Sequence, residues 1–293
     1  MSEVISKDLI ASHWAIAGNS YPGGDEVSPF PIEDRLQVAA ETGYTGIGLL
    51  HADLLAIEAK TPLDQLALRL QELGLRHVEV ECLIDWFAEG ARREASDRQR
   101  ANLIRAADAL GARHIKVNGD LEGVEWPFEM LAEEFARLCR EAAAVGSMVA
   151  IEFMPFSGVP DVRAAVELVE AAGEPNGRLL IDTWHVARAG TPLREVAAVP
   201  RELIGHVEID DALAEPEGGM WHDTVHNRLL PGEGELDVVG FLGAIRETGY
   251  DGPIGVEVIS STHRLLPLRE AAEAAFRTAT AVLEQEAGGG DRV

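Results

Sequence analysis

The sequence is poor in cysteine and in basic residues, and each shortage excludes a class of protein. Only two cysteines occur among the 293 residues, Cys82 and Cys139. They lie far apart and in no zinc-like spacing, so neither a disulfide framework nor a thiolate metal site is expected. The 25 Lys and Arg residues face 50 Asp and Glu residues, which gives a formal charge of −25. Such a charge repels nucleic acid phosphates and anionic membranes.

Long hydrophobic runs are also missing. Nowhere do about 18 apolar residues follow one another, as a membrane-spanning helix requires. The first residues, MSEVISKDLIASHW, lack the basic segment and apolar stretch of a secretory signal. We therefore expect a cytoplasmic protein whose partner is a small polyol, sugar or keto-sugar, with no nucleic acid or membrane partner. The sequence leaves self-association into a homo-oligomer open.

What the sequence does have is a regular alternation of short apolar runs and stretches with helical spacing. This rhythm is typical of βα units, and eight units predict an α/β fold, a single (β/α)8 TIM barrel over residues 1–293 with a loose tail from about 286. An open doubly wound sheet shares the rhythm, but no GxGxxG follows the first run. The candidate strands are 13–18, 46–51, 77–83, 114–119, 148–153, 178–183, 205–210 and 254–259.

Most candidate helices between these runs end in glycine. Glycine adopts the left-handed conformation that closes a helix without steric penalty. The sequence therefore predicts helix ends at Gly43, Gly74, Gly111, Gly146, Gly173 and Gly249.

Four apolar runs in the second half of the chain each end in a carboxylate. The carboxyl ends of barrel strands meet at one mouth, and a carboxylate is costly to desolvate there unless it meets a cation. The pattern therefore predicts one bound divalent metal ion, and two of the carboxylates, Glu152 and Glu257, are also placed to move protons. The four predicted ligands are Glu152 in VAIEF, Asp182 in LLIDTWH, Glu208 in HVEIDD and Glu257 in IGVEV.

Four further residues are candidates for substrate binding. His185 follows Asp182 by three residues, and Lys116 and His51 lie in or at the end of apolar runs. Arg228 belongs to the long segment 212–237, which exceeds an ordinary connection and is a candidate lid. Each has a structural alternative: a buried hydrogen-bonded histidine, a packed lysine stem, a structural terminal histidine or a solvated loop arginine. Trp14 and the segment 85–87 are candidates for an apolar pocket wall or for core packing.

The seventh run is ambiguous because three of its polar residues alternate. His206, Glu208 and Asp210 share one face of a strand, so each is a possible metal ligand. Glu208 is best placed between the lower barrel layer and the loop. Asp210 and Asp211 are expected to order the following loop.

Together these motifs resemble the xylose isomerase-like TIM barrels, a group that includes ketose 3-epimerases, inosose isomerases and dehydratases, hydroxypyruvate isomerases and endonuclease IV. The resemblance extends from GYTGIGLL (43–50) through GYDGPIGVEVIS (249–260). In that group Glu, Asp, His and Glu on the fifth to eighth strands hold a divalent metal. This implies metal-ligand roles for Glu152, Asp182 and Glu257.

The resemblance also implies roles for two residues outside this ligand set. The DTWH segment matches the DxxH of the group, in which the histidine contacts substrate, and this histidine is His185 here. Arg228, just before LLPGEG, resembles the arginine that contacts a substrate oxygen.

One position departs from the family pattern. Where many members read HIDD or HIKD, this chain reads Glu208-Ile209-Asp210-Asp211. We therefore predict Glu208 as the seventh-strand ligand, with His206 as the alternative. A shell of four carboxylates favours Mn²⁺ or Mg²⁺ over Zn²⁺.

The resemblance implies a metal-dependent isomerase or epimerase that acts on a sugar or polyhydroxy ketone through an ene-diolate. The alternative is a metal-dependent dehydratase or lyase with an inosose-, dehydroshikimate- or ketoglycoside-like substrate. A third interpretation is a non-catalytic binding subunit, because Glu208 departs from the ligand pattern. Endonuclease activity conflicts with the charge of −25 and with the absence of the additional histidine ligands of that enzyme.

Overall fold

Eight parallel strands close into a barrel in a computed structural model that describes residues 6–289. Each strand pairs with the next along the chain, and Leu9 of the first strand pairs with Ile254 of the last, which closes the ring. The predicted (β/α)8 barrel is therefore confirmed. The strands are β1 (Leu9–Ala11), β2 (Gly46–Leu50), β3 (His77–Leu83), β4 (His114–Asn118), β5 (Met148–Glu152), β6 (Gly177–Asp182), β7 (Ile204–Ile209) and β8 (Ile254–Val256).

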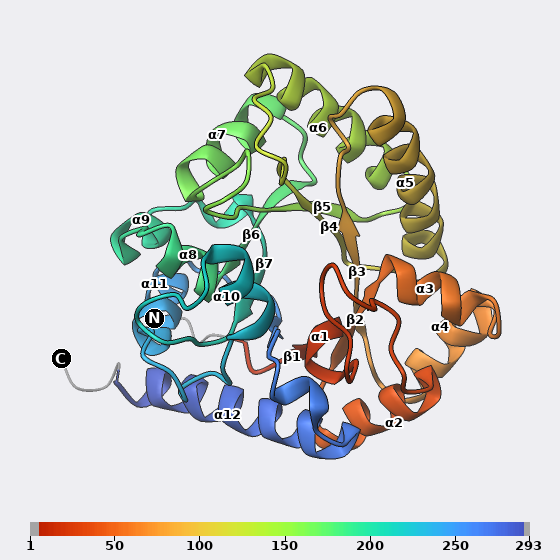
Figure 1. The fold of residues 1–293 in the computed structure, drawn as a ribbon, viewed down its shortest axis with the longest axis vertical. Helices are drawn as coiled ribbons and strands as arrows, with labels where there is room; N and C mark the ends of the chain where they lie inside the picture. The colour runs from red at the N-terminus through yellow and green to blue at the C-terminus, as the bar shows by residue number, and fades with distance from the viewer. Residues whose placement is uncertain (1–5, 290–293) are drawn as a thin grey trace.

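Helices surround the strands, as Figure 1 shows, and within the described residues none is long and apolar enough to cross a membrane. The longer helices are α2 (Ile32–Thr42), α4 (Leu63–Glu72), α5 (Gly90–Leu110), α6 (Phe128–Ala143), α7 (Val162–Ala172), α11 (Val238–Glu247) and α12 (Leu268–Gly289). The shorter ones are α1 (His13–Ile16), α3 (His51–Glu58), α8 (Thr183–Arg188), α9 (Leu193–Ala197) and α10 (Met220–His226), with 3₁₀ turns η1 (Arg201–Leu203) and η2 (His263–Leu265).

The prediction for the first strand was wrong. The run 13–18 contains the short helix α1, and the strand lies earlier, at Leu9–Ala11. Periodicity cannot distinguish a short buried helix from a short buried strand, because both read as an uninterrupted apolar run. The other seven predicted strands begin within one residue of the observed ones.

The predicted helix ends are confirmed. Gly43, Gly74, Gly111, Gly146, Gly173 and Gly249 all have positive φ. The loose tail from about 286 stays a prediction, and α12 continues to Gly289. Its apolar face packs into the core through Ala279 and Val282, and Arg246 Nε donates to Glu286 Oε1 at 2.5 Å. Residues 290–293 lie outside the described part of the chain.

The strands separate an apolar layer from a polar barrel interior. Because alternate residues of a strand point to opposite faces, Val78 and Val80 of β3 pack outward in the hydrophobic core. The intervening Glu79 and Glu81 are buried on the other face. The polar side chains inside the barrel also include His114, Lys116, Asn118, His206 and Glu208. The core thus holds the strands rigidly while their inner faces carry ionisable groups.

Candidate functional site

A pocket at the carboxyl ends of the strands contains most of the predicted site residues. Lys116, Glu152, His185, Arg228 and Glu257 all line it. These side chains come from β4, β5, α8, the segment after α10 and the position directly after β8. They are distant in sequence, and the closed barrel brings them together.

The predicted lid segment 212–237 forms part of the pocket wall. It folds into helix α10 and contributes Trp221, Thr224 and Val225 to the lining. In Figure 1, α10 lies inside the outline of the outer helices. The indole of Trp221 is half exposed, at 51%. The segment therefore covers the pocket as a short helix.

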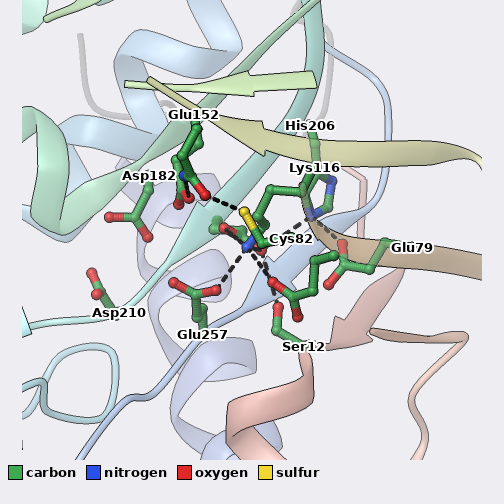
Figure 2. A network of polar contacts seen from close by, with 12 residues as sticks. Ser12, Glu79, Cys82, Lys116, Glu152, Asp182, His206, Asp210 and Glu257 are labelled. Carbon is green, nitrogen blue, oxygen red and sulfur yellow. Dashed lines mark hydrogen bonds and ion pairs between the residues drawn. The ribbon is translucent and has the colours of Figure 1, made fainter. Parts of the chain in front are cut away.

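Lys116 lies at the centre of a buried ionic network. Its Nζ is 2.9 Å from both carboxylate oxygens of Glu208, 2.7 Å from Glu257 Oε1 and 3.1 Å from Glu81 Oε2. Figure 2 shows its side chain reaching toward Glu257. Burial alone would lower the pKa of Lys116, but the carboxylates of Glu208 and Glu257 outweigh burial and hold this pKa well above its usual value. The ammonium is therefore a permanent charge at the base of the pocket.

Arg228 forms a second cationic centre, 1% exposed. Its Nη1 lies 3.1 Å from Asp182 Oδ2, 2.6 Å from Asp210 Oδ2 and 3.1 Å from Glu257 Oε2. Its Nη2 donates to Thr224 Oγ1 at 2.9 Å and lies 3.2 Å from His185 Nε2. The arginine is thus held by the site on several sides, which contradicts the solvated-loop alternative.

Glu152 is the pocket carboxylate with the lowered pKa. Asn118 Nδ2 donates to its Oε2 at 2.8 Å, and His185 Nε2 lies 3.5 Å from its Oε1. Burial alone would raise the pKa of Glu152, but Lys116 and His185 outweigh burial and lower this pKa. Within the described residues, Oε1 has no hydrogen-bond partner.

The pKa values of other carboxyl groups in the network are shifted in the opposite direction. Burial raises the pKa of Glu257, of Glu208 and, to about 8, of Glu81, although Lys116 acts against each shift. Among the described residues, the six buried carboxyl groups of Glu81, Glu152, Asp182, Glu208, Asp210 and Glu257 have two buried cations beside them, Lys116 and Arg228. The region therefore requires bound protons or a further cation.

Three of the four predicted metal ligands converge. Glu152, Glu208 and Glu257 each present an oxygen, and these atoms lie within 4.8 Å of one another. Carboxylate oxygens are the donors that hard divalent cations prefer, so these residues fit such an ion.

Asp182 is not part of this group among the residues that the structure describes. Its Oδ1 caps helix α8 by accepting from His185 N at 3.0 Å, and its Oδ2 accepts from Arg228. Its role as a fourth ligand remains a prediction.

The three alternating residues of β7 and its end, His206, Glu208 and Asp210, lie in different surroundings. Glu208 faces the pocket carboxylates and accepts from Ser12 Oγ at 3.1 Å. His206 lies deeper, with Nε2 3.1 Å from Glu79 Oε2. Asp210 turns toward Arg228 of the segment 212–237, and its Oδ2 accepts from Arg228 Nη1 at 2.6 Å, so it contacts the loop that it was expected to order.

Asp211 does order the loop, as expected. Its carboxylate accepts from the backbone nitrogens of Ala212, Gly232, Gly234 and Leu236. These bonds close the segment 212–237 onto the end of β7.

The remaining predicted residues divide between the pocket and the core. His51 lines the pocket at the start of α3, where burial lowers its pKa, and its Nε2 lies 3.3 Å from Asn102 Nδ2. Trp14 also lines the pocket. Trp86, by contrast, packs in the core and donates from Nε1 to the Asn118 carbonyl at 2.8 Å.

Sequence reasoning missed Glu81 and Asn118. Both contact predicted site residues, Lys116 and Glu152 respectively. The signal was present in the alternating segments HVEVE and HIKVN (77–81 and 114–118), where alternate residues share the inner face of the barrel. Because apolar residues flanked them, we predicted a site role only for Lys116 in these segments and treated the rest as strand residues.

Comparison with known proteins confirms the family. The model of the xylose isomerase-like TIM barrel family matches residues 36–284. A 3-dehydroshikimate dehydratase from Pseudomonas aeruginosa is 29% identical over 245 residues, 81% of this chain and 38% of the relative. A putative hydroxypyruvate isomerase from Streptomyces coelicolor is 28% identical, over 78% of this chain and 85% of the relative.

A similar fold occurs in the crystal structure of the IolI protein with a zinc atom. It has a TM-score of 0.82, 18% identity and coverage of 95% of this chain and 99% of the other. The chain spans about two fifths of the length of the two 3-dehydroshikimate dehydratases that it matches. Relatives in this group thus include both isomerases and dehydratases. From the family match and the closed barrel, the chain belongs to the xylose isomerase-like TIM barrel family.

Proposed function

We propose that this protein is a divalent-metal-dependent isomerase or epimerase of a small sugar or polyhydroxy ketone, acting through an ene-diolate. The observation that carries the proposal is the position of Glu152 and Glu257, which both line the pocket and lie with Glu208 in one carboxylate group. Two carboxyl groups that reach one ligand can remove a proton from a carbon and return it elsewhere.

The environments of these two carboxyl groups differ in a way that suits the reaction. The pKa of Glu152 is lowered and that of Glu257 is raised, the latter because burial disfavours its charge. Opposite shifts in neighbouring groups are typical of an acid and a base that work together. We assign proton removal to Glu152 and proton return to Glu257.

Glu152, Asp182, Glu208 and Glu257 are the residues that would hold the metal, with Mn²⁺ or Mg²⁺ favoured by their oxygen donors. When bound, such an ion acidifies a C–H bond beside a carbonyl. Lys116 and Arg228 lie close enough to these carboxylates to balance negative charge that develops on the substrate. His51 and His185 would contact substrate hydroxyl groups from the pocket wall.

A dehydratase is the second candidate, favoured by a specific contact. His185 Nε2 lies 3.5 Å from Glu152 Oε1, so the imidazole is placed beside the proposed base. After the same proton removal, His185 would protonate a departing hydroxyl group, which gives loss of water instead of isomerisation. The suitable substrates are inosose-, dehydroshikimate- or ketoglycoside-like ketones.

One experiment distinguishes the two reactions. The protein is incubated in D₂O with Mn²⁺ and a panel of ketoses, inososes and 3-dehydroshikimate, and the products are analysed by mass spectrometry and NMR. An isomerase gives a product of the same composition with deuterium at the carbon that changed, whereas a dehydratase gives an unsaturated product that has lost water. Glu152→Gln, incubated in parallel, should give neither product. If wild type neither exchanges deuterium nor converts any panel member, in Mn²⁺ or Mg²⁺, the proposal is wrong.

A further inference from the structure

A second cluster of metal-ligating side chains lies deeper in the barrel. It consists of Glu79 on β3, His114 on β4 and His206 on β7, each 0% exposed. His206 Nε2 is 3.1 Å and His114 Nε2 3.4 Å from Glu79 Oε2, and the two imidazole centroids are 4.6 Å apart. Figure 2 shows Glu79 and His206 beside the network around Lys116.

The polar atoms of this cluster lack hydrogen bonds. Among the described residues, both carboxylate oxygens of Glu79 and all four ring nitrogens of His114 and His206 are buried without a partner. A buried polar atom without a partner destabilises the fold, and more so when it is charged. These three side chains, each with one ligand atom within 4.8 Å of the others, offer a place for a ligand.

The strands beside the cluster leave room for it. A Cβ atom at Gly48 would come within 2.5 Å of Glu79 Oε1, and one at Gly255 within 2.7 Å of His206 Nε2. Glycine at these positions of β2 and β8 gives the carboxylate and the imidazole space to point inward, although the same Cβ atoms would also meet His13 N and Glu208 Cγ. The barrel is thus shaped around these side chains.

The distances between the donor atoms match those expected around one shared metal ion. Two donors that each lie about 2.1 Å from one tetrahedral metal are about 3.4 Å apart, close to the separations of 3.1 and 3.4 Å found here. Two imidazoles and one carboxylate form a nitrogen-rich set, which suits Zn²⁺ better than Mn²⁺ or Mg²⁺. The pocket group, by contrast, offers three carboxylates.

We propose that Glu79, His114 and His206 form a second, buried metal site that takes Zn²⁺. The site is closed to solvent, so the ion enters while the barrel folds and stays bound afterwards. His206 Nε2 lies 3.8 Å from Glu208 Oε1. An ion bound to His206 therefore stabilises the layer of inward-facing side chains directly beneath the pocket. The proposal is independent of the reaction that the pocket performs.

The test uses the full chain, unfolded in denaturant with a chelator and refolded with Zn²⁺. After treatment of the folded protein with EDTA, we expect one equivalent of zinc to remain, with nitrogen donors in its X-ray absorption spectrum. His114→Gln should lose this equivalent. His77→Gln, outside the cluster at the start of β3, and Glu152→Gln, in the pocket group, should both retain it.

If His114→Gln does not fold, the X-ray absorption spectrum of the wild type still tests the proposal, because that measurement requires no variant. Oxygen donors alone would place the ion at the pocket carboxylates and overturn the proposal. So would a retained ion in folded His114→Gln, or wild type that folds fully with no zinc after EDTA. His185→Gln should leave the nitrogen signal unchanged, and loss of that signal would assign the donor to the pocket instead.

Discussion

Lys116 and Glu208 face each other across the barrel, with the ammonium 2.9 Å from both oxygens of the carboxylate. By its sequence resemblance to the family, Glu208 is predicted to take the position where many members have a histidine ligand. The additional negative charge of this chain is therefore paired with a buried lysine. Because Glu208 and Glu257 both contact Lys116 and both belong to the proposed metal site, the ammonium competes with a metal ion for the same oxygens.

Replacing Lys116 with Met should strengthen metal binding and weaken the metal-free fold. Without the competing ammonium, we expect affinity for Mn²⁺ to rise about tenfold or more, equivalent to about 1.4 kcal/mol. In chelator, the uncompensated buried carboxylates should reduce the free energy of unfolding by about 3–5 kcal/mol. Calorimetric titration and urea unfolding measure the two effects.

Lys60→Met is the matched control, because Lys60 is exposed and the chain has no other lysine besides Lys7 and Lys116. Lys60→Met should change neither the affinity for Mn²⁺ nor the free energy of unfolding. Weaker Mn²⁺ binding in Lys116→Met would show that the lysine supports the metal site instead of competing with it.

The barrel was predictable from the sequence because its evidence is local. Each strand is a short segment rich in apolar residues, and glycines such as Gly111 and Gly173 end helices through backbone conformation alone. The first strand was missed because Leu9–Ala11 is only three residues long and the longer run 13–18, which contains a short buried helix, follows it. Length and composition do not distinguish such short elements.

The site was only partly predictable because its contacts join distant segments. Glu152 and Glu257 follow from their position at strand ends, where the fold class alone places them at the mouth. The engagement of Asp182 by Arg228 depends on how the segment 212–237 folds back, and 46 residues separate the two side chains. No local sequence pattern indicates that two residues so far apart in the chain are in contact.

Glu152→Gln and Glu257→Gln should each reduce kcat on an identified substrate by about 10²–10⁴-fold, because each removes a proposed proton-transfer group. Each also removes a ligand charge, so affinity for Mn²⁺ should fall in the same variants. Glu233→Gln, at an exposed loop position, is the control for loss of one negative charge. Wild-type turnover in either active-site variant would refute the two-residue mechanism.

Asp211→Ala should destabilise the protein more than the loss of an ordinary helix cap. Four backbone nitrogens donate to Asp211, and leaving several without a partner should lower the free energy of unfolding by about 2–4 kcal/mol. Asp237, the cap of α11, accepts from Gly240 N alone, so Asp237→Ala should lower it by about 1 kcal/mol. Urea unfolding at constant metal concentration compares the two variants. Equal losses of unfolding free energy would contradict the stabilising role of Asp211 in the loop.

Glu208→His should shift the metal preference of the pocket from Mn²⁺ toward Zn²⁺. The substitution restores a nitrogen donor beside the carboxylates of Glu152 and Glu257, and imidazole suits zinc better than a third carboxylate does. It also frees Lys116 from one of its partners, although Glu81 and Glu257 still contact the ammonium. The barrel should therefore remain folded.

Competition binding of Mn²⁺ and Zn²⁺ to wild type and Glu208→His measures this shift. Both proteins are compared in the His114→Gln background, so that the deeper cluster does not contribute zinc. We expect the ratio of zinc to manganese affinity to rise about tenfold or more, equivalent to about 1.4 kcal/mol. An unchanged ratio would mean that Glu208 does not contact the metal, and that its carboxylate serves only to hold Lys116 in the barrel.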